Sequence, residues 1–248
     1  MNIYDIAKEA GVSISTVSRV LNDKGYVSAK TKARIQEVLK RNKYQPSAIA
    51  RGLVSGTMKN VAIVTVDVRH PHYAMTTFIM EQKLTGLGYM VLVCNTGAKK
   101  EECMKYLRML SRNQVEGVIL VGSEFNELCD PDELSQLLPE TPIVMANGEL
   151  KLPSVQSILV DEGYGVQLAV QHLYDRGHRN ISFVMDTQKD AAVRKQNGFL
   201  MKMKQFGYDD AKERILYTGY GVEGGEQAAK QIVGDARRYD AAIFTEDL

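Results

Sequence analysis

The sequence predicts two parts of different fold class, a small all-α head followed by an α/β body of two lobes with parallel sheets. Charge divides the chain at the same place: residues 1–58 hold 10 Lys and Arg against 4 Asp and Glu, and residues 59–248 hold 21 against 26. Apolar residues recur at helical spacing in the head. In the body they form short runs that alternate with helical stretches, which is typical of a parallel sheet covered by helices.

The first 22 residues predict two short helices joined by a tight turn. Asn2 can cap the first helix, with Asp5 as the reciprocal partner of a capping box. Gly11 can adopt the left-handed conformation that ends a helix, and Ser13 can cap the second helix. The apolar positions expected in the core are Ile6, Ala7, Ala10, Val17, Val20 and Leu21.

Ala7, Gly11 and Val17 keep the spacing of a helix-turn-helix, whose second helix presents its N-terminal residues to DNA bases. The residues left on the outer face are Ile14, Ser15, Thr16, Ser18 and Arg19. Two amphipathic helices around a glycine also occur in other small domains, and a basic surface is often only a solvated face. Their coincidence here favours phosphate contact and therefore DNA binding by the head.

A third helix is expected between Ser28, which can cap it, and about Arg41. Pro46 breaks it, and Ser47 can cap a short helix over residues 48–54. Such a short helix is marginal alone in water and needs outside support to form. The alternative is an ordinary linker with an exposed leucine.

The body contains two series of alternating segments. Strands are expected at 61–66, 91–94, 115–121 and 143–146 in the first series, and at 157–160, 181–185, 215–217 and 241–245 in the second. Helices are expected near 78–87, 101–112, 131–138, 164–176, 194–206 and 224–236. Two series indicate two lobes. Ligands of such sheets bind outside the carboxyl ends of the strands, so the cleft between the lobes is the candidate binding site.

Three stretches resemble the LacI/GalR family of bacterial transcription regulators: YDIAKEAGVSISTVSRVLN, YQPSAIARGLVSGT and GHRNISFV. The resemblance covers the whole chain and implies a helix-turn-helix head at 1–45 and a hinge at 46–58. It further implies a periplasmic-binding-protein-like effector domain, with its N-terminal lobe at 59–158 and an incomplete C-terminal lobe at 159–248. Family members continue past residue 248, so we expect a C-terminally truncated chain or, as the alternative, a shortened natural protein.

The resemblance assigns DNA contacts by position. Ile14 and Ser15 begin the recognition helix, where the apolar Ile14 would touch a thymine methyl group, and Arg19 matches a position that contacts bases or phosphate. Positions that contact the DNA backbone are matched by Tyr4, Ser13, Thr16, Asn22, Ser28 and Thr31. The hinge contributes Ala50, Arg51 and Leu53, and Leu53 matches a leucine pushed between base pairs in the minor groove.

The resemblance also implies effector contacts at strand ends. The loop after the first strand contains His70, Pro71, His72 and Tyr73, where the family usually has Asn-Pro-aromatic-aromatic, and His72 and Tyr73 would face the effector. The two histidines could instead suggest a metal. We expect none, because no carboxylate or cysteine stands nearby at ligand spacing.

Three further effector contacts follow from the family pattern. Asn147 ends the fourth strand, where the family often has Asp. A ligand-binding arginine is expected three residues before a glycine, which matches Lys195, with Arg194 beside it at the opening of a helix; the choice between the two stays open. Glu246 replaces the first residue of the usual Asn-Asp pair after the last strand, which puts the usual hydroxyl-binding pattern in doubt.

Other function classes find little support. The chain lacks a Walker loop, a Gly-x-Gly-x-x-Gly after a strand, a Gly-x-Ser-x-Gly and a paired Cys-x-x-Cys, so we expect neither an enzyme nor a cofactor. Three unevenly spaced cysteines and the absence of a signal peptide or membrane span predict a cytoplasmic protein with reduced thiols, associated with the nucleoid when bound to DNA.

These observations predict a DNA-binding regulator, a repressor or in a variant an activator, that binds a near-palindromic operator as a homodimer. A sugar, sugar acid or sugar phosphate would bind between the lobes and shift their arrangement. The alternatives are a solute-binding protein of the periplasmic type, against which the head argues, and an enzyme that carries a DNA-binding head.

Overall fold

The computed structural model describes residues 2–23, 25–44, 57–234 and 238–246. The chain divides into two compact units, Met1–Asn60 with Gln114–Glu116, and Val61–Asn113 with Gly117–Leu248. Within the described ranges, no helix is both long enough and apolar enough to cross a membrane. The predicted hinge helix, with Ala50, Arg51 and Leu53, lies outside the described residues.

The head consists of helices α1 (Ile3–Glu9), α2 (Ile14–Leu21) and α3 (Ala29–Arg41). The predicted capping box is confirmed, since the Asn2 side chain accepts from the Asp5 N–H and the Asp5 side chain accepts from the Asn2 N–H. Gly11 has a φ of 62°, and Ser13 and Ser28 cap α2 and α3. The buried core comprises Ile6, Ala7, Ala10, Val17, Ile35 and Val38.

Residues 57–59 are anchored within the first unit by Glu116. The Thr57 hydroxyl donates to Glu116 Oε1 at 2.5 Å, and the Lys59 N–H donates to the same oxygen at 2.8 Å. The hydrogen bond from Thr57 is the main cause that lowers the pKa of Glu116 below its ordinary value. Glu116, which precedes the strand at 117–121, therefore holds the end of the predicted hinge region.

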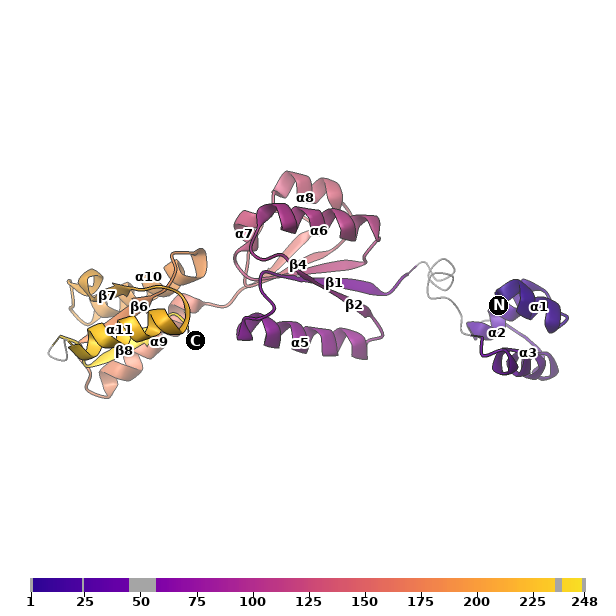
Figure 1. Ribbon diagram of the computed structural model, residues 1–248, viewed down its shortest axis with the longest axis horizontal. Coiled ribbons are helices and arrows are strands. Elements are labelled where there is room, and N and C mark those ends of the chain that lie inside the picture. Colours follow the sequence, from indigo (N-terminus) through magenta and orange to yellow (C-terminus); the bar gives the residue numbers. More distant parts are fainter. Residues whose placement is uncertain (1, 24, 45–56, 235–237, 247–248) are drawn as a thin grey trace. The chain divides into compact units, whose positions relative to one another are not determined.

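The first lobe is a five-stranded sheet in the order β2-β1-β3-β4-β5. Its strands are β1 (Asn60–Thr65), β2 (Met90–Asn95), β3 (Gly117–Val121), β4 (Ile143–Ala146) and β5 (Val155–Ile158). The pairs β1–β3, β3–β4 and β4–β5 are parallel. Helix α5 (Pro71–Gly86) covers one face, and α6 (Lys100–Arg112) and α8 (Pro131–Leu137) cover the other (Figure 1).

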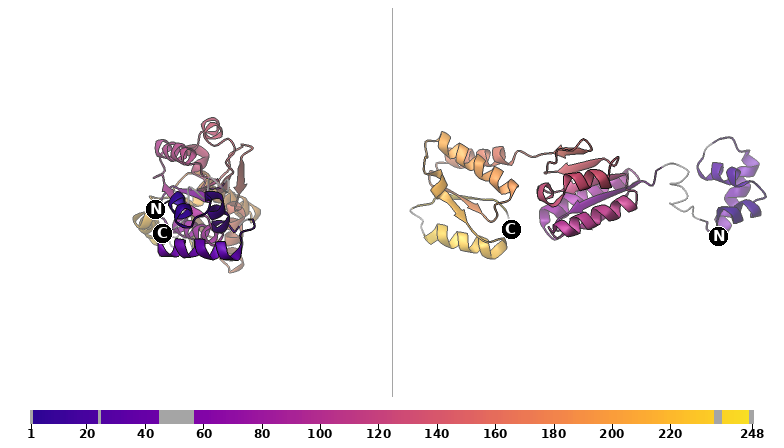
Figure 2. Two further views of the ribbon diagram at one scale, coloured as in Figure 1. Left: turned by 90° about the vertical axis from the view of Figure 1, so that its right-hand side faces the viewer. Right: turned by 90° about the horizontal axis from the view of Figure 1, so that it is seen from above.

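The second lobe is a three-stranded parallel sheet in the order β7-β6-β8. The strands are β6 (Ile181–Met185), β7 (Ile215–Tyr217) and β8 (Ala241–Phe244), and the helices are α9 (Glu162–Asp175), α10 (Asp190–Gln205), the 3₁₀ turn η1 (Ala211–Arg214) and α11 (Gly221–Gly234). Figure 2 shows α10 and α11 on opposite faces of this sheet. Its core joins Val166 and Val170 of α9 to Phe183 of β6 and Phe199 of α10.

Three sequence expectations need correction. The segment predicted at 157–160 as the start of the second series is β5, which belongs to the first sheet. Helix α5 begins at Pro71 rather than near Phe78, because His70 caps it and proline suits the first helical position. Helix α7 (Phe125–Leu128) was not expected, since a single turn leaves no periodic pattern. The division at 45, 58 and 158 stays a prediction.

Candidate functional site

The outer face of α2 presents the predicted recognition residues to solvent. Ile14 is 40% exposed and Tyr4 66%, and Ser15 and Arg19 are also exposed. The stem of Arg19 lies beside Gly25, which has a φ of 73°, and a Cβ added there would lie 3.5 Å from Arg19 Cδ. This arrangement leaves the guanidinium group available to a partner.

Several predicted backbone contacts also cap helices. Ser13 Oγ accepts from the Thr16 N–H and lies 2.8 Å from the Ser15 hydroxyl, and Ser28 Oγ accepts from the Thr31 N–H. Hydroxyl groups at a helix N-terminus stand beside the free N–H groups that favour phosphate. Asn22 instead caps the end of α2, where its amide donates to the Ser18 carbonyl at 3.0 Å.

A cavity of about 1480 Å³ lies in the second unit and is lined by residues that follow strands of both lobes. Five of the six predicted effector residues line it: His72, Tyr73, Asn147, Lys195 and Glu246. Arg194 is not among the lining residues. Most of these side chains therefore lie where ligands of parallel sheets bind, outside the carboxyl ends of the strands.

Arg194 and Lys195 point to different surroundings. Arg194 Nε donates to Glu162 Oε2 at 2.9 Å, and Asn147 Nδ2 donates to the other carboxylate oxygen at 2.9 Å. Lys195 Nζ donates to the Thr245 carbonyl at 2.8 Å and lies 3.9 Å from Glu246 Oε1. Helix α10 begins at Asp190 and not at Arg194, so both residues lie in its second turn, about 100° apart around the axis.

Tyr73 is held against the wall of the cavity. Its hydroxyl donates to Glu124 Oε2 at 2.8 Å, and Lys189 Nζ lies 3.4 Å from Glu124 Oε1. Burial and the nearby Glu124 carboxylate raise the pKa of Tyr73 far above its ordinary value. Gly122 permits this contact, since a Cβ there would lie 2.7 Å from Glu124 Oε2 and 3.1 Å from the tyrosine hydroxyl.

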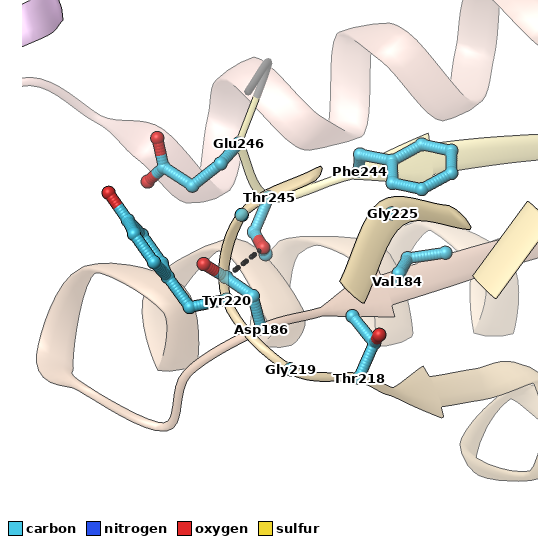
Figure 3. Close-up of a pocket in the computed structure, with 10 residues that line it drawn as sticks. Val184, Asp186, Thr218, Gly219, Tyr220, Gly225, Phe244, Thr245 and Glu246 are labelled. Carbon is cyan, nitrogen blue, oxygen red and sulfur yellow. Dashed lines mark hydrogen bonds between the residues drawn. The ribbon is translucent and has the colours of Figure 1, made fainter. Parts of the chain in front are cut away.

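A small pocket adjoins the cavity between the ends of β6 and β8 (Figure 3). The Thr245 hydroxyl donates to Asp186 Oδ1 at 2.6 Å, and Tyr220 and Glu246 extend their polar ends to the same side. Burial, followed by the Glu246 charge, raises the pKa of Tyr220. Gly224 is required here, because a Cβ on it would overlap the Gly219 carbonyl. The glycine-rich stretch 219–225, which turns the chain into α11, therefore also lines this pocket.

No group of three or more His, Cys, Asp or Glu side chains in the described part of the chain could hold a metal ion. The His70 side chain caps α5 by accepting from the His72 N–H, and its Nε2 lies 3.7 Å from Glu246 Oε2.

Two family models match the chain. Residues 2–47 match "Bacterial regulatory proteins, lacI family", and residues 58–234 match "Periplasmic binding proteins and sugar binding domain of LacI family". The second match alone covers more than half of the sequence.

The chain belongs to the LacI family. An HTH-type transcriptional regulator of Lachnoclostridium phytofermentans is 31% identical over 250 residues, which cover 100% of this chain and 75% of the relative. The repressor PurR of Mannheimia succiniciproducens is 28% identical and covers 99% of this chain and 73% of its own length. The fold is that of the lac repressor dimer bound to operator and an anti-inducer, with a TM-score of 0.79 at 20% identity over 100% of this chain and 74% of that chain.

Membership of the LacI family makes this chain a helix-turn-helix transcription regulator and not an enzyme. The alternative of a periplasmic-type solute-binding protein is not favoured, because the head and the body match this family together.

The structure of this LacI-family chain adds cavity residues that the sequence reasoning missed. They are Asp67, Arg69, Glu124, Glu162, Asp186, Lys189 and Tyr220. The signal that could have found most of them is the same strand-end rule, since Glu124 follows β3, Asp186 follows β6 and Tyr220 follows β7. Glu162 begins helix α9 and does not follow a strand directly, so the rule does not predict it. Only the structure shows that it lines the cavity.

Proposed function

We propose that this LacI-family protein represses transcription by binding a near-palindromic DNA operator as a homodimer, and that an uncharged sugar-like effector in the cavity controls this binding. One observation carries the proposal: the same chain has an exposed recognition face on α2 and an α/β body whose strand ends place charged side chains around a large cavity. Its site of action would be the bacterial cytoplasm, where it would associate with the nucleoid through DNA.

The DNA part rests on the exposed N-terminal half of α2. Ile14 and Ser15 would read base edges, and Arg19 would contact bases or phosphate. Hydroxyl groups that cap helices, such as that of Ser28, would bind the DNA backbone and fix the register of the protein on it. Leu53, Ala50 and Arg51 would act in the minor groove, as the family pattern implies. Whether bound protein represses or activates would depend on where the operator stands.

Selection of DNA sites by the full chain tests this part. We expect enrichment of near-palindromic sites, and we expect Arg19→Ala to lose at least about 5-fold in affinity for them, the effect of about 1 kcal/mol. Arg176→Ala removes the same charge from an exposed position at the end of α9 and should bind as wild type. Loss of non-specific binding to the same extent would assign Arg19 to phosphate, and enrichment of no sequence would refute the proposal.

Dimerisation is supported by an exposed apolar stripe on α5. Met75, Phe78 and Ile79 are 59%, 57% and 52% exposed and lie on one face of the helix at i, i+3 and i+4 spacing. Met90 and Val93 of β2 are also exposed, at 60% and 47%. An exposed apolar stripe such as that of α5 favours a protein interface. Among known structures, the lac repressor is described as a dimer on its operator.

The cavity favours an uncharged effector over a sugar acid or sugar phosphate. Its described lining holds five carboxylates, those of Asp67, Glu124, Glu162, Asp186 and Glu246, against the cations Arg69, Lys189 and Lys195. Each of these cations has an acidic side chain close by: Arg69 binds Asp67, Lys189 lies beside Glu124, and Lys195 lies beside Glu246.

An anionic effector would have to displace these carboxylates from their partners, whereas sugar hydroxyls can donate to the carboxylate oxygens. Solved structures similar to this chain include the transcriptional regulator CelR in complex with cellobiose and a LacI-family regulator of Lactobacillus casei with bound sucrose or glucose.

Titration calorimetry on the full chain tests this ligand class. The panel would contain aldoses and disaccharides together with gluconate and glucose 6-phosphate. We expect at least one uncharged sugar to bind at least about 10-fold more tightly than its acid or phosphate, a difference of about 1.4 kcal/mol. Binding of only a nucleobase or an amino acid, or tighter binding of the phosphate, would contradict the proposal.

A further inference from the structure

Two of the three cysteines meet in the interior of the first lobe. Cys103 lies in the first half of α6, and Cys129 is the residue that ends α7. Their Sγ atoms are 3.8 Å apart, and the residues are 0% and 3% exposed. Cys94, also buried, lies on β2 and provides an internal reference thiol.

The two sulfur atoms are in van der Waals contact. A disulfide has an S–S length of about 2.0 Å, so closing the gap needs each sulfur to move by about 0.9 Å. The two residues stand on separate elements, α6 with its buried Leu107 and Leu110 and the single turn α7 with its buried Phe125, so the two sulfurs can move relative to each other. Local opening of the lobe around these elements would admit a small oxidant.

We propose that Cys103 and Cys129 form a reversible intramolecular disulfide when a peroxide reaches them, and that this bond ties together two loops of the cavity wall. Gly97 and Ala98, just before α6, and Gly122 to Glu124, just before α7, all line the cavity. A bond between the two helices therefore restrains both loops. Formation of the bond does not depend on which effector the cavity binds.

The chemistry divides the roles of the two thiols. The contact between the two thiols lowers the pKa of Cys103 and, together with burial, raises the pKa of Cys129. The Cys103 thiolate attacks one peroxide oxygen, the O–O bond breaks, and hydroxide leaves, which gives a sulfenic acid. The Cys129 sulfur then attacks the Cys103 sulfur, and the sulfenic oxygen leaves as water with the Cys129 proton. In sum, two thiols and one hydrogen peroxide give one disulfide and two waters.

To test the bond, the reduced full chain is treated with hydrogen peroxide and then alkylated under denaturing conditions. Mass spectrometry counts the thiols that have been alkylated. We expect two of three thiols to be protected and a tryptic pair that links the Cys103 and Cys129 peptides, because Lys105, Arg108 and Arg112 separate them. Dithiothreitol should restore all three thiols. Cys94→Ser should keep the protection, whereas Cys103→Ser and Cys129→Ser should each abolish it.

Because a serine in the core can impair folding, Cys103→Ala and Cys129→Ala serve as second variants, with circular dichroism to verify the fold. A link that involves Cys94, a link between two chains, or three free thiols after treatment would overturn the proposed bond.

The restraint on the cavity wall is tested by hydrogen exchange of the oxidised and reduced chains without any effector. We expect slower exchange after oxidation in segments 96–102 and 122–130 and unchanged exchange over 181–185, in the second lobe. Equal exchange in both wall segments, with the disulfide shown to be present, would overturn the coupling between the thiol pair and the cavity.

Discussion

At the scale of single residues, Lys195 and Arg194 show how neighbours in the sequence acquire different roles. Lys195 lines the cavity, whereas Arg194 binds the Glu162 carboxylate behind it. The Glu162 side chain is only 10% exposed and that of Arg194 is 40% exposed. Arg194 thus acts on the cavity through the carboxylate that it holds, and Lys195 can contact an effector directly.

Replacement of Lys195 should affect effector binding, and replacement of Arg194 should affect the stability of the fold. We expect Lys195→Met to weaken the wild-type effector at least about 10-fold, with a nearly unchanged Tm, because it removes one polar wall group. Arg194→Met should lower the free energy of unfolding by about 1–3 kcal/mol, because it leaves a largely buried carboxylate with fewer partners. Calorimetric titration and thermal unfolding measure the two effects. Wild-type affinity in Lys195→Met would remove that residue from the effector site.

Sequence reasoning at this scale succeeded where a residue's role depends on its chain neighbours. Asn2, Ser13 and Ser28 cap helices as expected, since a cap acts on N–H groups two or three residues away. It could not choose between Arg194 and Lys195, because the choice depends on where α10 begins and on Glu162 of another helix.

At the scale of elements, helices α9 and α10 approach each other at a pair of glycines. A Cβ added to Gly198 would overlap the Gly163 carbonyl oxygen, so the two backbones touch at this crossing. Glu162 and Arg194 form their ion pair beside it. The crossing therefore helps to position the carboxylate that lines the cavity.

Alanine substitution should show by its effect on stability that Gly198 differs from Gly165, a helical glycine without close neighbours. We expect Gly198→Ala to reduce the free energy of unfolding by about 3 kcal/mol, because the helices must separate. Gly165→Ala, on α9 with no atom within 4 Å of the added Cβ, should raise it by about 0.5–1 kcal/mol through helix propensity. Denaturant titration of both variants measures the difference. Equal stabilities would show that the crossing can relax.

Strand prediction also worked at this scale. The runs at 143–146, 181–185 and 215–217 coincide with β4, β6 and β7, because strands of a parallel sheet covered by helices appear as apolar runs, and β6 is buried along its whole length. The assignment of β5 to the second series was wrong, since sheet membership depends on pairing with β4, a contact that no local pattern encodes.

At the scale of the whole molecule, β3 connects the two regions on which regulation would depend. Glu116, just before it, binds Thr57 and Lys59 at the end of the predicted hinge. Gly122 to Glu124, just after it, line the cavity. Strand β3 thus joins the residue that binds Thr57 and Lys59 to the loop that lines the cavity.

Assembly should depend on the apolar stripe of α5. We expect Phe78→Glu to shift the protein toward monomers and to weaken operator binding, because a charge would be desolvated in the interface. Met201→Glu introduces the same charge at a similarly exposed position, 55%, on α10 and should leave assembly unchanged. Sedimentation velocity checks both variants. A dimer of wild-type affinity with Phe78→Glu would place the interface elsewhere.

The sequence by itself determined the helix-turn-helix head, the α/β body and five of the residues that line the cavity, because caps, periodicity and strand ends are local features of the chain. Only the tertiary structure decided that Lys195 rather than Arg194 lines the cavity, that Glu162 belongs to its wall, that β5 joins the first sheet and that Cys103 meets Cys129. Each of these depends on contacts between residues far apart in the chain, and such contacts follow from how the elements pack.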